Sequence, residues 1–77
     1  MTYSQADLEL AERHVAQATR HVVEQEERIM RLRSLGHPTK QADDLLLQFE
    51  FTLRQHEQHR DAIFHDLANR PDNSGPK

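Results

Sequence analysis

Length, composition and charge exclude several classes of protein. A chain of 77 residues with 35% hydrophobic content can build one small domain at most, and without cysteine it has no disulfide to support a thin core. A net charge of −3 argues against a nucleic-acid-binding domain, which would carry a basic surface. No apolar run approaches the ~20 residues of a membrane span, and the N-terminus lacks a signal-peptide pattern. We therefore expect a cytoplasmic protein that binds neither nucleic acid nor membrane.

The first predicted helix covers about residues 5–35. Its start carries a capping box, Ser4 with Asp7 three residues later, and Tyr3 and Leu8 have the spacing of a hydrophobic staple. Heptads counted from Leu8 place apolar residues at the a and d positions, which form the seam of two packed helices, with Gln25 as the polar exception. These seam positions are Leu8, Ala11, Val15, Ala18, Val22, Gln25, Ile29 and Leu32.

The residues between the two heptad patterns, 36–39, predict a turn. Gly36 can take the left-handed conformation that ends a helix, and Pro38 disfavours a helical conformation at His37. Thr39 is suited to cap a second helix, whose first turn contains Asp43 near the positive end of the helix dipole. These features exclude one continuous helix.

The second predicted helix covers about residues 40–69 and is ended by Asn69-Arg70-Pro71. With Leu46 at a, apolar residues again dominate the seam, but His56 and Arg60 interrupt it. We expect Gln25, His56 and Arg60 to form polar layers that fix the register of the helices at a cost in stability. The seam positions of this half are Ala42, Leu46, Phe49, Leu53, His56, Arg60, Ile63 and Leu67.

The sequence therefore predicts an all-α fold, an antiparallel two-helix hairpin over residues 1–70, followed by a disordered tail over residues 71–77. Such a hairpin has one seam and no third layer, so we expect a partner to supplement its core. The facing pairs expected from a turn at residues 36–39 are Ile29 with Leu46, Val22 with Leu53, Val15 with Arg60, Ala11 with Ile63 and Leu8 with Leu67.

One flank of the hairpin, on the side of the heptad e positions, carries apolar residues that the seam does not bury. A contiguous exposed apolar patch usually marks an interaction surface, and we interpret this one as the place where a second hairpin docks. The expected result is a homodimer that forms an antiparallel four-helix bundle. The alternatives are a higher oligomer and a different protein partner. The patch consists of Ala16, Val23, Met30, Leu47 and Phe51.

The opposite flank, on the side of the g positions, carries most of the histidines. His56 and His59 share one helix face and, with His14 or His21 as a third ligand, could hold a transition-metal ion. Di-iron bundles add inward glutamates, which are missing here, and the spacing differs from H-E-x-x-H, so the sequence predicts no bound cofactor. The alternatives are bis-histidine haem ligation and a pH switch, since clustered imidazoles repel one another when they become charged below about pH 6.5.

No arrangement of catalytic residues stands out. The hydroxyls of Ser4, Ser34 and Ser74 lie at helix ends or in the tail, and no glycine-rich loop is present to bind phosphate. We therefore expect a non-enzymatic interaction or adaptor protein that self-associates through its helices. The alternative is a histidine-based metal-binding or pH-sensing helical bundle.

Three stretches carry a family resemblance: Glu12-Arg13-His14-Val15-Ala16, the turn Gly36-His37-Pro38-Thr39, and the leucine-rich run over residues 42–61. Together they resemble short helical-hairpin proteins of unknown role from alphaproteobacteria. The resemblance covers about residues 8–63, and its most specific part is the G-H-x-T turn, with Pro38 where an acidic residue is more usual. It implies a bacterial protein with a hairpin fold and adds no functional residue.

Overall fold

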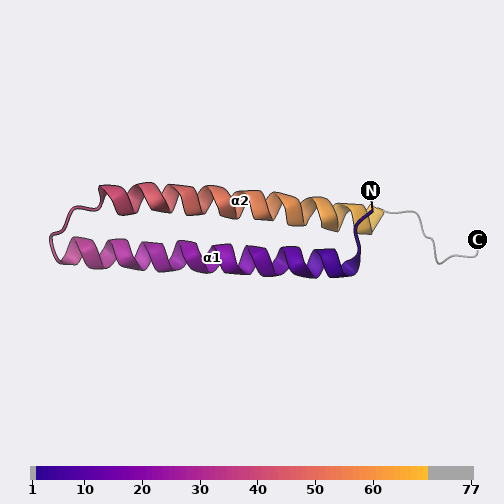
Figure 1. The fold of residues 1–77 in the computed structure, drawn as a ribbon, viewed down its shortest axis with the longest axis horizontal. Helices are drawn as coiled ribbons and strands as arrows, with labels where there is room; N and C mark the ends of the chain where they lie inside the picture. The colour runs from indigo at the N-terminus through magenta and orange to yellow at the C-terminus, as the bar shows by residue number, and fades with distance from the viewer. Residues whose placement is uncertain (1, 70–77) are drawn as a thin grey trace, which may run out of the picture.

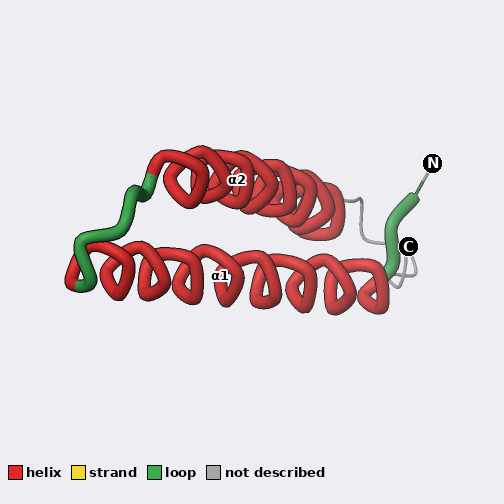
Figure 2. The backbone as a smooth tube through the Cα atoms, turned by 60° about the vertical axis from the view of Figure 1, so that its left-hand side comes forward, coloured by secondary structure: helices red, strands yellow, loops and turns green. Residues whose placement is uncertain are grey.

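The computed structural model describes residues 2–69, which form two long antiparallel helices (Figure 1). Helix α1 spans Gln5–Ser34 and helix α2 spans Lys40–Asn69. One short loop joins them, and the described residues contain no strand (Figure 2). The all-α hairpin predicted from the sequence is confirmed. The tail predicted for residues 71–77 lies outside the described residues.

The N-terminal segment closes the open end of the hairpin. The predicted capping box is confirmed: the Ser4 hydroxyl accepts from the Asp7 N–H at 3.2 Å, and the Asp7 carboxylate accepts from the Ser4 N–H at 2.8 Å. Residues 2–4 then cross from α1 to the end of α2 (Figure 1). There the N–H of Tyr3 donates to the Asp66 carboxylate at 3.5 Å, and Tyr3 packs against the cluster that contains Leu8.

The turn begins with a Schellman motif at the end of α1. Gly36 has φ +73°, and its N–H donates to the Arg33 carbonyl at 3.0 Å. The N–H of His37 donates to the Leu32 carbonyl at 2.9 Å, which satisfies a second carbonyl of the last helical turn. The Thr39 hydroxyl was expected to accept from an N–H of the first turn of α2, but it donates to the Asp43 carboxylate at 3.0 Å and accepts no such bond.

The seam holds the core, and all the predicted seam positions are buried or half-buried. At the open end, Ile63 is only 1% exposed and clusters with Leu8 and Ala11, which agrees with the predicted pairing at this level. Near the turn, Ile29 and Ala42 are buried. The heptad pattern therefore selected the correct face of each helix.

The polar seam residues behave in different ways. Gln25 is 6% exposed, and its side-chain amide donates to the backbone carbonyl of Ala42 at 2.9 Å, which ties the two helices together near the turn. His56 and Arg60 are half-buried farther along the seam. The Arg60 guanidinium pairs with the adjacent Asp61 at 2.9 Å. Each polar group inserted into the seam thus has a partner or access to water.

Candidate docking face and histidine flank

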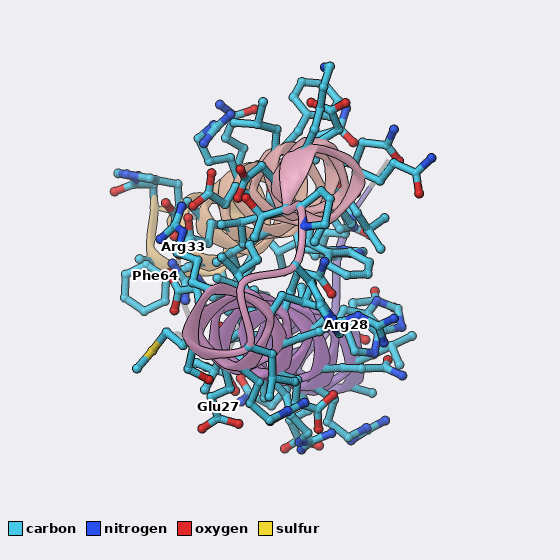
Figure 3. All side chains as sticks on the ribbon, turned by 90° about the vertical axis from the view of Figure 1, so that its left-hand side faces the viewer. Glu27, Arg28, Arg33 and Phe64 are labelled. Carbon is cyan, nitrogen blue, oxygen red and sulfur yellow. The ribbon has the colours of Figure 1, made fainter. Side chains whose placement is uncertain are left out.

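Side chains beside the seam lie on two flanks that differ in chemistry. Viewed along the hairpin from the turn, Arg33 and Phe64 lie on one side and Arg28 lies on the other (Figure 3). The e flank consists of Glu12, Thr19, Glu26 and Arg33 of α1 with Asp43, Glu50, Glu57 and Phe64 of α2. The g flank consists of Asp7, His14, His21 and Arg28 of α1 with Leu45, Thr52, His59 and Asp66 of α2.

A groove opens on the e flank beside the turn. Its volume is about 290 Å³, and the seam residues Ile29 and Leu46 form its apolar floor. Ile29 is 4% exposed, whereas Met30 on the rim is 66% exposed. Leu47, which follows Leu46, is 64% exposed at the b position next to the e flank. The groove is lined by Glu26, Ile29, Met30, Arg33, Asp43 and Leu46.

The residues predicted to form the docking patch, Ala16, Val23, Met30, Leu47 and Phe51, are all exposed. They do not share one face equally. Phe51 is at an f position, which points away from the seam, so it lies on the back of α2 rather than over the groove.

Phe64 was not part of the predicted patch. It is 57% exposed and lies on the same side of the hairpin as Arg33 in the end-on view of Figure 3, but at the open end rather than near the turn. The signal that could have found it was its e position in the α2 heptads.

The e flank is acidic, and part of its charge is not compensated. Arg33 and Asp43 form an ion pair across the flank at 3.8 Å. One heptad farther from the turn, the equivalent positions hold Glu26 and Glu50. Within residues 2–69, neither of these carboxylates has an ion-pair or hydrogen-bond partner. Glu50 is also half-buried. Two like charges therefore face the same stretch of the flank with no cation between them.

Rings from the two sides of the hairpin contact one another along the g flank. Each contact joins a ring from α1 or the segment before it to a ring from α2, and two of the contacts are one heptad apart. The pairs and their centroid distances are Tyr3 with His59 at 6.0 Å, His14 with His56 at 5.3 Å, and His21 with Phe49 at 5.5 Å.

The candidate metal ligands do not converge on one point. The structure brings His14 and His56 together, but the ring of His59 contacts Tyr3 and that of His21 contacts a phenylalanine. In the part of the chain that the structure describes, no group of three or more His, Asp or Glu side chains is placed to hold a metal ion. A metal would therefore need His59 to leave Tyr3 and turn toward the His14–His56 pair.

A second groove, of about 240 Å³, lies at the open end of the g flank. Ala11 and Ile63 form its floor, and His14, His59 and Leu10 are among the residues around it. Tyr3 from the N-terminal segment also lines it, so the chain itself already occupies part of this surface.

Two of the serine hydroxyls bond to backbone groups at helix ends. Ser4 accepts from the backbone N–H of Asp7, and the Ser34 hydroxyl donates to the Arg31 carbonyl at 2.8 Å. Ser74 lies outside the described residues. Neither Ser4 nor Ser34 is paired with a base that could activate it as a nucleophile.

No protein-family model matches the chain, and neither a curated protein nor a solved structure matches it. The resemblance to alphaproteobacterial hairpin proteins therefore stays a prediction. Over residues 2–69, no helix combines the length and apolar character that crossing a bilayer requires. The functional inference consequently rests on the geometry of the two flanks.

Proposed function

We propose that this chain is a small, non-enzymatic interaction protein whose e flank docks against another helical surface. The observation that carries the proposal is the groove beside the turn, with Ile29 and Leu46 on its floor and Met30 exposed on its rim, while Leu47 is exposed at the neighbouring b position. An apolar surface bounded by polar residues is the usual place where one protein binds another. A docked partner would also add a second layer to a hairpin that has a single seam.

The simplest docked partner is a second copy of the chain, which would complete a four-helix bundle. Met30 and Leu47 of both copies would then contact one another around the two-fold axis. Glu26 and Glu50 oppose this arrangement, because the same symmetry brings the carboxylates of both copies into one interface. We expect the homodimer to form when salt screens these charges, since the Debye length falls to about 3 Å at 1 M salt.

Sedimentation velocity at about 50 mM and about 1 M NaCl tests the docking face. We expect a dimer at high salt, and we expect Leu47→Ser to abolish it. Leu10→Ser removes a leucine that is 44% exposed at a c position beside the g flank, and it should leave the dimer intact. A monomer at both salt concentrations would refute self-association, and a dimer sensitive only to Leu10→Ser would place the interface on the g flank.

One observation favours pH sensing as a second candidate function. The rings of His14 and His56 contact one another at 5.3 Å across the seam, and His56 is half-buried there. Two imidazoles that both become charged at this distance repel each other. We propose that acidification loosens the packing at this level of the hairpin. Metal binding, the other form of this candidate, needs a rearrangement of His59.

A further inference from the structure

We propose that the partner that docks on the e flank at ordinary ionic strength is a basic amphipathic helix of another protein. It would place apolar side chains on the groove floor and a lysine or arginine between Glu26 and Glu50. This inference rests on the proposed function and identifies the chemistry of the docked partner.

The unpaired carboxylates of Glu26 and Glu50 lie at one level of the e flank. Glu26 and Glu50 lie one heptad from Arg33 and Asp43, whose charged groups approach to 3.8 Å across the same flank. The backbone positions at this level are therefore close enough for side-chain groups to meet. A single cation inserted between Glu26 and Glu50 would contact both carboxylates and form charge-assisted hydrogen bonds. The chain supplies no such cation within its described residues.

Negative charge predominates over the whole face. Carboxylates at the e positions and the neighbouring b positions outnumber the cations there. Arg54, which lies within one helical turn of Glu50 and Glu57, forms no ion pair with either. The carboxylates are Glu9, Glu12, Glu26, Asp43, Glu50, Glu57 and Asp61, and the cations are Arg33, Lys40 and Arg54.

Exposed apolar residues of α1 form a regularly spaced row. Ala16, Val23 and Met30 follow one another at heptad spacing, and Met30 lies on the rim of the groove beside the turn. A docked helix presents its own side chains with the same spacing, so it can follow this row over several turns. The helices are about 45 Å long, which gives room for a partner helix of about three heptads.

The same charges disfavour other occupants. A second copy of the chain would bring equivalent carboxylates together, as described above, unless salt screens them. Nucleic acid and anionic lipid surfaces carry negative charge and would be repelled by this face. A basic helix is the occupant that satisfies both the apolar floor and the unpaired carboxylates.

The test uses two fluorescently labelled peptides of about three heptads, one built from leucine, alanine and lysine, and one in which glutamate replaces every lysine. Fluorescence anisotropy measures their binding to the full chain. We expect the lysine peptide to bind and the glutamate peptide not to bind. The double variant Glu26→Gln with Glu50→Gln should weaken binding of the lysine peptide by at least about tenfold.

A matched double variant controls for net charge. Glu24→Gln with Glu27→Gln removes two exposed carboxylates from c and f positions, which lie away from the e flank, and should change binding by less than about threefold. Circular dichroism checks that both double variants stay helical and melt no earlier than the wild type. Equal weakening in the two double variants, or binding of the glutamate peptide, would overturn the inference.

The outcomes separate this inference from the proposed function. If the lysine peptide does not bind but the salt-dependent dimer still requires Leu47, then docking on the e flank stands and its basic partner is refuted. If neither peptide binding nor dimerisation occurs, the proposed function fails together with the inference.

Discussion

Ile63→Ala is the substitution that tests the packing of the hairpin most directly. Ile63 is 1% exposed and clusters with Leu8 and Ala11 at the open end. The substitution removes three carbon atoms, or about 2.4 kcal/mol at ~0.8 kcal/mol for each buried CH₂ group, and an unfilled cavity brings the usual range to about 2–5 kcal/mol. A domain of this size has a total stability of roughly 4–10 kcal/mol. The substitution therefore removes a large share of it.

Thermal unfolding followed by far-ultraviolet circular dichroism measures the effect. We expect the melting temperature to fall by at least about 8 °C, because 1 kcal/mol shifts it by about 4–8 °C in a small domain. Phe64→Ala is the control, since Phe64 follows Ile63 along α2 but is 57% exposed. Loss of the Phe64 ring should change the free energy of unfolding by less than about 0.5 kcal/mol. If Phe64→Ala destabilised the chain more than Ile63→Ala did, the seam would lie on a different face of α2, and the register would be wrong.

The remaining predictions concern the turn, the polar seam and the histidines. Gly36→Ala should lower the free energy of unfolding, measured with urea, by roughly 1–2 kcal/mol. The loss comes from backbone strain alone, because φ is +73° and an added Cβ would meet no atom beyond the neighbouring residues within 4 Å. Gln25→Leu removes the side-chain hydrogen bond to the Ala42 carbonyl, but this carbonyl still accepts the backbone hydrogen bond of its helix. The free energy of unfolding should therefore change by less than about 1.5 kcal/mol. NMR contacts between the helices should nevertheless reveal mixed registers, because the polar residue that fixes the register is lost. Between about pH 7.5 and about pH 5 the melting temperature of the wild type should fall by more than that of His56→Gln, because the His14 and His56 rings lie 5.3 Å apart and two charged imidazoles repel each other. Excess Zn²⁺, Ni²⁺ or Cu²⁺ should not raise the melting temperature. A metal site would stabilise the fold by about 2.7 kcal/mol at a hundredfold excess over its dissociation constant, and a rise of this size that His56→Gln abolishes would contradict the prediction.

Local sequence rules were sufficient for the parts of the fold that depend on neighbouring residues. Ser4 and Asp7 form the capping box because both groups belong to one helical turn. Gly36 ends α1 because the left-handed conformation is intrinsic to glycine. The seam followed from the heptad spacing, which places Ala11 and Ile63 at the same level once the turn is located.

Contacts between side chains that are distant in sequence were harder to predict. The ring of His59 contacts Tyr3 because residues 2–4 cross to the end of α2, and no periodicity indicates that path. The level pairing that places Ile29 opposite Leu46 also places Glu26 and Glu50 at one level of the e flank, so this pair is predictable from the sequence. Phe64 lies outside the predicted patch because that patch takes its apolar residues from b and f positions, whereas Phe64 is at an e position.

Apart from Ala18, the buried apolar side chains of residues 2–69 lie toward the two ends of the hairpin. Leu8, Ala11 and Ile63 lie at the open end and Ile29 and Ala42 lie near the turn, whereas most seam residues between them are only half-buried, and the His14–His56 ring contact lies in that stretch. Local opening costs least where few apolar contacts are buried. Hydrogen-bonded amides near the middle of α1 and α2 should therefore exchange with solvent before those around Ala11, Ile29 and Ile63. Partial unfolding of this protein would begin in the interior of its helices.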